Sequence, residues 1–493
     1  MFYRLIAFLK KWPLFLYVLP VFFVGHGFTE NYDFVPVIDA LQLTLVYLGF
    51  SLLFSCLFWL LYRNFIKANL ASFCIMAFHF FFGSVHDMLK KWVPDSFLVK
   101  YIFLLPAALI LFIILFIVIK KRKTPLLRLS YYLNVVLALL LVADIVLLTG
   151  KVITKKKALY SLPNGFVSCD SCAKPDIYFI LADEYAGNTA LKDLFQFNDS
   201  IFLQQLDTLN FHTVAESSSN YNYTPFSVAS ILNMDYLDLK GKNRTTPDLT
   251  YCYEAIRDNK LLQFLRSDKY QFYNHSVFDF EGQPARIRES FLAAKTRLIT
   301  SQTFISRFNK EIRFNLVSRW KSKSNLKILT YANKNNNENI YNLTWKLAEQ
   351  KSTTPKFVYT HLMMPHYPYY FDKNGKEQPF ETLLEDNQVN KEGYIGYLQY
   401  SNKKLMELVR HIVQSSSKPP IIVLMGDHGF RHFKKPVDYK YYFLNLTSVY
   451  LPSKNYTGFR DSLTGVNLFR TLLNTELGQR LPFLKDSSSY LLD

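Results

Sequence analysis

The sequence predicts a membrane protein in two parts. The first is an α-helical transmembrane bundle of about five spans at residues 1–150, and the second is an α/β domain with a mainly parallel sheet covered by helices at residues 175–493. Hydrophobic residues make up 50% of the chain, and the apolar ones gather before about residue 150. Beyond the juxtamembrane linker, residues 151–174, short apolar runs end in acids and histidine, which is typical of parallel strands that carry ligands.

Five apolar stretches in the first part are long enough, or nearly so, to cross a hydrocarbon core, which needs roughly 20 residues. They lie at residues 12–28, 38–62, 67–86, 97–119 and 129–150. Buried helices of a soluble core could explain any one of them. Five in succession indicate a membrane bundle.

The distribution of basic residues predicts the orientation of these spans. Lysine and arginine cluster before the first stretch, between the second and third, and at residues 120–128, whereas the loop at residues 29–36 is acidic. The positive-inside rule then places the N-terminus in the cytoplasm. With an odd number of spans in the cell membrane, the C-terminal domain is extracytoplasmic. The first stretch lacks a small-residue cleavage site and is not expected to be a cleavable signal peptide.

The net charge of +18 does not predict a nucleic-acid partner, because no nucleic-acid-binding motif accompanies it. Lysines at residues 151–157 are instead expected to face anionic phospholipid headgroups. No protein partner is identifiable. Cys169 and Cys172 would lie in an oxidising compartment, so we expect them to form a local disulfide rather than a metal site.

Two strand ends carry candidate metal ligands. The apolar run at residues 421–425 leads into Gly426-Asp427-His428-Gly429-Phe430, and the run at residues 176–182 leads into Asp183 and Glu184. Carboxylate and imidazole side chains at one edge of a sheet indicate a metal site. The structural alternative for Asp427 is a strand-end aspartate that caps a turn.

Two histidines follow another predicted strand, residues 357–359. His361 and His366 could bind a metal or an anionic substrate, although His361 could also be a core histidine with a satisfied hydrogen bond. Arg431 and His432, after the second strand end, could bind anionic substrate or lie in a solvated loop.

Thr224 precedes Pro225 and an apolar segment, the pattern of a helix N-cap followed by proline at the first helical position. Capping alone would account for this threonine. The same location also offers backbone N–H groups and a positive dipole end to a phosphate group. A threonine hydroxyl needs a metal or a base to act as a nucleophile near neutral pH.

Four blocks occur in a specific order: DIYFILADEY, SNYNYTPFSVASILNMDYL, HLMMPHYPYYFD and PPIIVLMGDHGF. Through them the soluble part, roughly Lys174 to Asn474, resembles the alkaline phosphatase and sulfatase superfamily. Within that superfamily it resembles the membrane-anchored branch that includes lipoteichoic acid synthase and the phosphoethanolamine transferases.

The resemblance implies one or two divalent metal ions, Zn²⁺ or Mn²⁺, and a threonine that carries a covalent intermediate. It implies that Thr224 is the catalytic nucleophile and that His366 binds the transferred phosphate. The implied metal ligands are Asp183 or Glu184, Thr224, Asp427 and His428. Two departures matter: the tandem acids divide the ligand assignment, and the C/S-x-P-x-R motif of formylglycine sulfatases is absent, which disfavours an ordinary sulfatase.

The resemblance further implies transfer of phosphoethanolamine or phosphoglycerol from a membrane phospholipid donor to an extracytoplasmic glycan or lipid acceptor. A membrane-anchored phosphodiester or sulfate-ester hydrolase would use the same residues, with water in place of the acceptor. A non-catalytic membrane scaffold would need neither Thr224 nor the Asp427-His428 pair.

The remaining elements follow from periodicity and composition. Leucine and isoleucine at helical spacing predict a helix over residues 394–412 beside the strand that leads to Asp427. We also expect a strand at residues 441–450, a closing helix at residues 463–473, and a loop at the asparagine-rich residues 333–340.

Overall fold

The computed structural model describes residues 8–492, apart from gaps at 33–34, 36, 94–95, 123–125, 159–161, 170–171, 284, 286–295, 309–329 and 384–386. The chain divides into two compact units. The first contains residues 1–155 and 293–322, and the second contains residues 156–292 and 323–493. The described part of that later segment, residues 296–308, which the sequence analysis assigned to the catalytic domain, therefore belongs with the helical bundle.

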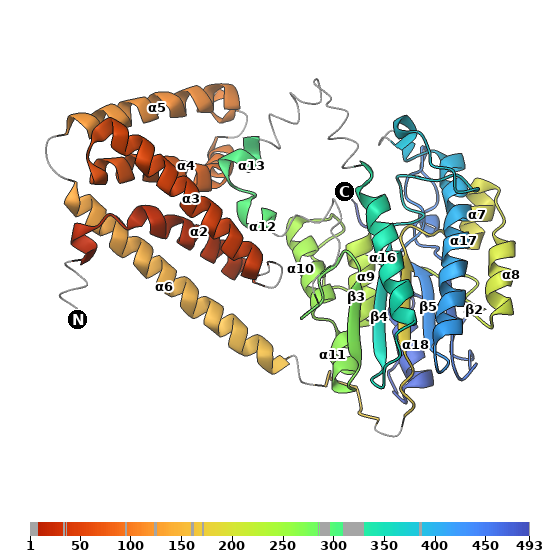
Figure 1. The fold of residues 1–493 in the computed structure, drawn as a ribbon. Coiled ribbons are helices and arrows are strands. Elements are labelled where there is room, and N and C mark those ends of the chain that lie inside the picture. The colour runs from red at the N-terminus through yellow and green to blue at the C-terminus, as the bar shows by residue number, and fades with distance from the viewer. Residues whose placement is uncertain are drawn as a thin grey trace. The chain divides into compact units, whose positions relative to one another are not determined.

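The first unit is a helical bundle (Figure 1). Its helices are α2 (Phe15–Glu30), α3 (Val37–Tyr62), α4 (Phe65–Trp92), α5 (Tyr101–Lys121) and α6 (Leu127–Ala158), with the short helices α12 (Arg297–Thr300) and α13 (Phe304–Phe308) from the later segment. Among the described residues, α3, α4, α5 and α6 are long and apolar enough to cross a membrane, while α2 is a shorter apolar helix of 16 residues. The helix α6 continues through part of the predicted linker.

Apolar side chains cover the outside of the bundle as well as its interior. Phe15 and Phe80 are fully buried in its core, yet Ile102 is 85% exposed and Leu45 is 68% exposed. In water so much exposed apolar surface would be unfavourable, whereas in a bilayer it contacts lipid chains. The long apolar helices thus fit a membrane anchor.

The second unit contains a six-stranded, mostly parallel sheet with the strand order β2-β6-β5-β1-β4-β3. The strands are β1 (Ile177–Ala182), β2 (His212–Thr213), β3 (Gln271–His275), β4 (Lys356–Leu362), β5 (Ile421–Gly426) and β6 (Thr447–Tyr450). Strands β3, β4, β1 and β5 are parallel neighbours, β6 pairs antiparallel with β5, and β2 pairs antiparallel with β6 at the edge of the sheet. The α/β fold class predicted from the sequence is confirmed.

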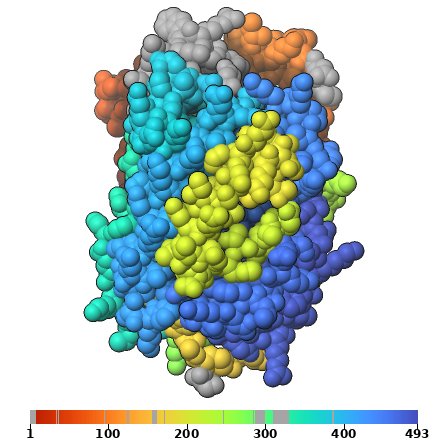
Figure 2. Space-filling view, turned by 90° about the vertical axis from the view of Figure 1, so that its right-hand side faces the viewer, coloured from red at the N-terminus to blue at the C-terminus, as the bar shows by residue number. Residues whose placement is uncertain are grey.

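Helices cover both faces of this sheet because its central strands are apolar on both sides. In β1, Phe179 and Leu181 pack on one face, and Tyr178 and Ile180 pack on the other. The first face carries α9 (Thr224–Asn233), α10 (Thr246–Arg257), α11 (Lys260–Ser267) and α18 (Gly465–Glu476). The second face carries α7 (Asn188–Phe195), α8 (Ser200–Thr208), α16 (Ala332–Ala348) and α17 (Lys391–Ser415), and Figure 2 shows the surface of this side with α7 and α8 in yellow.

Several local expectations are confirmed and two are wrong. The predicted helices appear as α17 and α18, and Cys169 and Cys172 form a disulfide. Residues 333–340 are helical in α16 rather than a loop, because Ile340 is buried and the Asn337 side chain bonds to both backbone groups of Met363. Residues 441–450 are a strand only from Thr447, because a 3-10 turn, η5 (Tyr439–Tyr442), precedes it.

Candidate active site

The strand register brings the predicted ligands to one edge of the sheet. Leu181 of β1 lies opposite His361 of β4 on one side and Met425 of β5 on the other. All three strands run parallel, so the residues that follow β1 and β5 emerge together at their carboxyl ends. Asp183 and Asp427 therefore become neighbours although they are far apart in the sequence.

Asp183, Asp427 and His428 form a first cluster, whose ligand atoms lie within 4.8 Å of one another. All three side chains are fully buried. Asp183 Oδ1 and Asp427 Oδ2 have no hydrogen-bond partner, although Asp427 Oδ2 lies 3.1 Å from His428 Nε2. Buried carboxylate oxygens without partners are costly unless a cation binds them, so this cluster fits a divalent metal ion.

Thr224 is the first residue of α9 and lies beside this cluster. Its Oγ1 is 3.2 Å from His428 Nε2, and its residue is 6% exposed. The predicted N-cap role is wrong: the helix cap is Tyr223, and the Thr224 hydroxyl lies within hydrogen-bond distance of His428 Nε2 instead. Proline in the first turn of α9 is confirmed. The hydroxyl is thus directed to the cluster instead of to the helix backbone.

Ser227, one turn into α9, holds the helix against the end of β5. Its hydroxyl donates a 2.5 Å hydrogen bond to the carbonyl oxygen of Asp427. This bond joins the element that carries Thr224 to the element that carries the Asp427-His428 pair. The geometry between hydroxyl and cluster is therefore fixed by packing rather than by a mobile loop.

Hydrogen bonds also fix the tautomers of two histidines. His428 Nδ1 donates to the Gly429 carbonyl at 2.8 Å, which leaves Nε2 with its lone pair toward Thr224 and the cluster. His361 is fully buried; its Nε2 lies 3.0 Å from Asp183 Oδ2 and its Nδ1 3.2 Å from the Tyr359 hydroxyl. Both nitrogens are engaged, so of the two interpretations of His361, the structure favours the satisfied core histidine, here one that orients Asp183.

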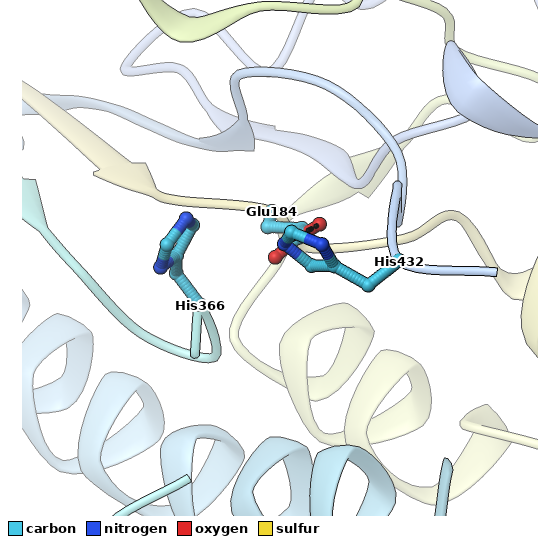
Figure 3. Close-up of side chains that lie close together, drawn as sticks. All are labelled: Glu184, His366 and His432. Atoms are coloured by element: carbon cyan, nitrogen blue, oxygen red, sulfur yellow. Dashed lines mark ion pairs between the residues drawn. The ribbon is translucent and has the colours of Figure 1, made fainter. Parts of the chain in front are cut away.

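Glu184, His366 and His432 form a second cluster, whose ligand atoms also lie within 4.8 Å of one another. Figure 3 shows the two imidazoles arranged about the Glu184 carboxylate. Glu184 Oε2 and His432 Nε2 are buried without hydrogen-bond partners. His366 Nδ1 donates to the Tyr367 carbonyl, which leaves its Nε2 as the free nitrogen. Two imidazoles and a carboxylate are a common ligand set of zinc.

The two consecutive acids therefore lie in different clusters, Asp183 in the first and Glu184 in the second. Glu184 adopts a left-handed backbone conformation with φ of +61°, which is unfavourable for a residue with a side chain. Tyr394 of α17 stabilises the turn, because its hydroxyl donates to the Glu184 carbonyl at 2.8 Å and accepts from the Ala186 N–H at 3.1 Å. The turn sends Asp183 and Glu184 in different directions.

The pKa values of the cluster residues are shifted in both directions. Burial alone would raise the pKa of Asp183 and Glu184, but the neighbouring histidines, with Arg431 near Glu184, outweigh it and lower both pKa values. Burial raises the pKa of Asp427, and the nearby Asp183 charge adds to this. Burial lowers the pKa of His432 to about 4, so its imidazole is neutral near pH 7, the state that binds metals.

Two arginines approach the ring of Tyr223, the residue before Thr224. The guanidinium carbon lies 3.6 Å from the ring centroid for Arg244 and 4.7 Å for Arg431. The Arg431 backbone N–H also donates to Glu184 Oε1 at 2.8 Å. Arg431 and His432 are therefore partly buried site residues rather than a solvated loop. Arginine is well suited to hold phosphate oxygens.

All nine predicted site residues lie at this edge of the sheet. Sequence reasoning missed Arg244 and Tyr394, because neither lies in one of the four blocks and no local pattern singles them out. It also separated His366 and His432 from the metal ligands, since their convergence on Glu184 depends on the fold of two loops.

The fold and these clusters define a membrane-anchored α/β domain with a candidate metal centre. A family model described as Sulfatase matches residues 192–469, more than half of the 493 residues. The chain belongs to the sulfatase family. The match includes Thr224, His366 and the Asp427-His428 pair, and it begins after Asp183 and Glu184.

Solved structures with a similar fold include the C-terminal periplasmic domain of EcEptC from Escherichia coli in complex with Zn. It has a TM-score of 0.40 and 11% identity, over 64% of this chain and 86% of that one. The putative sulfatase yidJ from Bacteroides fragilis has a TM-score of 0.38 and 12% identity, over 63% and 75%. The phosphonate monoester hydrolase of Agrobacterium radiobacter has a TM-score of 0.37 and 11% identity, over 62% and 74%. A search of curated protein sequences finds no significant match.

Proposed function

We propose that this protein is a membrane-bound, metal-dependent transferase that moves a phospho-alcohol group from a phospholipid to an extracytoplasmic glycan or lipid acceptor. The phospho-alcohol group would be phosphoethanolamine or phosphoglycerol. The observation that carries the proposal is the Thr224 hydroxyl, buried at the start of α9 and 3.2 Å from His428 Nε2. The basic loops of the bundle support an external catalytic domain.

Two divalent ions, Zn²⁺ or Mn²⁺, would be held by the two clusters. Asp183, Asp427, His428 and Thr224 would hold the first, and Glu184, His366 and His432 would hold the second. When bound, such ions would lower the pKa of the Thr224 hydroxyl and offset the negative charge that develops on phosphate oxygens. His366 thus becomes a proposed metal ligand rather than a direct phosphate contact.

The side chains suggest two displacement steps at phosphorus. In the first, Thr224 Oγ1 bonds to phosphorus, the bond to the diacylglycerol oxygen breaks, and that oxygen takes up the threonine proton. In the second, an acceptor hydroxyl bonds to phosphorus, and Thr224 leaves and recovers a proton. Arg431 and the N–H groups at the start of α9 would hold the phosphate oxygens during both steps.

The test uses the full-length protein in vesicles of phosphatidylethanolamine or phosphatidylglycerol with a labelled headgroup. We expect diacylglycerol release that stops on chelation and returns with Zn²⁺ or Mn²⁺, with the label on a glycan or lipid. Label found only as a free phospho-alcohol would show a hydrolase instead. Unchanged diacylglycerol release by Thr224→Ala would contradict both enzymes.

A further inference from the structure

Residues 296–308 leave the α/β unit in the sequence and pack in the helical bundle. The described residues of this segment belong to the bundle's compact unit, whereas β3 before it and α16 after it belong to the α/β unit. The described part contains α12 and α13. We call residues 296–308 the anchor segment. It lies in the sequence between β3 and α16, well away from the transmembrane stretches.

Two glycines provide a notch for the anchor segment. A Cβ atom added at Gly27 of α2 would lie 2.7 Å from Ile299 Cγ2, and one added at Gly83 of α4 would lie 2.5 Å from the Gln302 carbonyl oxygen. The Gly83 N–H also donates a 2.7 Å hydrogen bond to that carbonyl. Ile299 is only 6% exposed and belongs to the bundle core. By contrast, a Cβ at Gly49 of α3 would meet nothing within 4 Å.

Aromatic packing and an ion pair extend this contact along α4. The Phe304 ring lies 5.3 Å from that of Phe78 and 5.1 Å from that of Phe82, centroid to centroid. The Arg307 guanidinium pairs with Asp87, one turn beyond Gly83, and Ile305 beside it is 57% exposed. Contacts with a glycine, with aromatic rings and with a charged side chain thus all place the anchor segment against the C-terminal half of α4.

Gly83 and Asp87 lie shortly before two lysines in the last turn of α4. Lysines at the end of an apolar helix are typical of the membrane–water interface, where their long side chains reach the headgroups. An aromatic and aliphatic segment with one paired arginine suits that depth. A loop that only rested on the surface would not need glycines on two helices to make room for it. The contact is therefore built into the bundle sequence.

We infer that the anchor segment is a second attachment of the catalytic unit to the membrane bundle, independent of the covalent connection through α6. It docks non-covalently in the notch of Gly27 and Gly83 and is locked by the pair Asp87 and Arg307.

The test separates the two attachments. A protease recognition sequence is inserted at the exposed turn Asn164–Gly165, which follows α6. The full-length protein is folded in membranes, cleaved there, and washed at physiological ionic strength, because high salt would also weaken the pair of Asp87 and Arg307. We expect the C-terminal fragment to stay with the membrane pellet, and to be lost from it with Gly83→Leu but not with Gly49→Leu.

Charge exchange keeps the test valid if the glycine variant folds poorly. Asp87→Arg is expected to release the fragment, and Asp87→Arg combined with Arg307→Asp to restore its retention. Release of the wild-type fragment would overturn the inference. Retention in both Gly83→Leu and Asp87→Arg would also overturn it, because lipid contact alone would then hold the fragment. The readout is sedimentation, so it does not depend on whether the proposed enzyme activity is correct.

Discussion

At the scale of residues, the tandem acids Asp183 and Glu184 lie in two different clusters. Asp183 and Asp427 each follow an apolar run of strand type, which predicts that they meet at one edge of the sheet. Which acid serves which cluster depends on the left-handed turn at Glu184, and no residue pattern encodes that turn. His432 is a further example, because it meets Glu184 only when the loop after β5 folds back.

Metal content tests the division into two clusters. The purified wild-type protein is expected to bind about two divalent ions per chain, and Asp427→Ala and His432→Ala each to lose about one, since each removes a ligand from a different cluster. Elemental analysis after gel filtration measures this, with the exposed Asp461→Ala as a control. Unchanged metal content in His432→Ala would rule out the second cluster.

Asp199 predicts a pH dependence of stability. It is 4% exposed and bonded to Tyr185 and Asn402, and burial raises its pKa from 3.8 to about 6. The folded state therefore binds this proton more tightly than the unfolded state. The contribution of Asp199 to stability is greatest below pH 4 and falls as the pH rises to 6, by about 3 kcal/mol.

Asp199→Asn removes this titration and keeps an acceptor for Asn402. We expect the melting temperature of the wild type, relative to the variant, to decrease between pH 4 and pH 6 and then to stay level. Thermal unfolding of both proteins in the same detergent measures the difference, in which other titrating groups cancel. Parallel curves over this range would contradict the assignment.

At the scale of elements, strands and amphipathic helices followed the sequence pattern, and tertiary contacts decided the exceptions. The asparagine-rich start of α16 has weak helix propensity, yet burial of Ile340 and the bonds of Asn337 hold it helical. Thr224 looked like a cap, but α9 begins at Thr224 itself, one residue earlier than the pattern indicated. Because of that shift, the Thr224 hydroxyl faces His428 in the candidate active site.

Gly429 tests how tightly the loop after β5 is held. A Cβ there would lie 2.3 Å from the Tyr441 carbonyl oxygen and 2.8 Å from that of Leu444, both backbone atoms that cannot move aside easily. We expect Gly429→Ala to destabilise the domain by about 1–3 kcal/mol and to lower metal content. Gly396→Ala in α17 is the control, because its nearest contact would be 3.7 Å. Equal melting temperatures for the two variants would contradict this packing.

At the scale of the whole molecule, hydropathy predicted the membrane part, and the order of four blocks predicted the α/β part. The attachment of residues 296–308 to the bundle escaped the sequence analysis, because a short segment between β3 and α16 has no span-like hydropathy. The role of its partners, Gly27 and Gly83, depends on the close approach of the segment to the packed helices, which the sequence does not reveal. The proposed transfer reaction depends on one chemical event, the attack of Thr224 on phosphorus.

Intact mass of the full-length protein tests that event directly. The metal-loaded protein in detergent is incubated with phosphatidylethanolamine or phosphatidylglycerol, quenched and weighed by mass spectrometry, beside Thr224→Ala, Thr224→Ser and the exposed control Thr208→Ala. We predict a mass increase equal to one phospho-alcohol group in the wild type and the control, absent from Thr224→Ala and regained in part by Thr224→Ser, which keeps a hydroxyl. Diacylglycerol release without any adduct, or an adduct that persists in Thr224→Ala, would contradict the covalent role of Thr224.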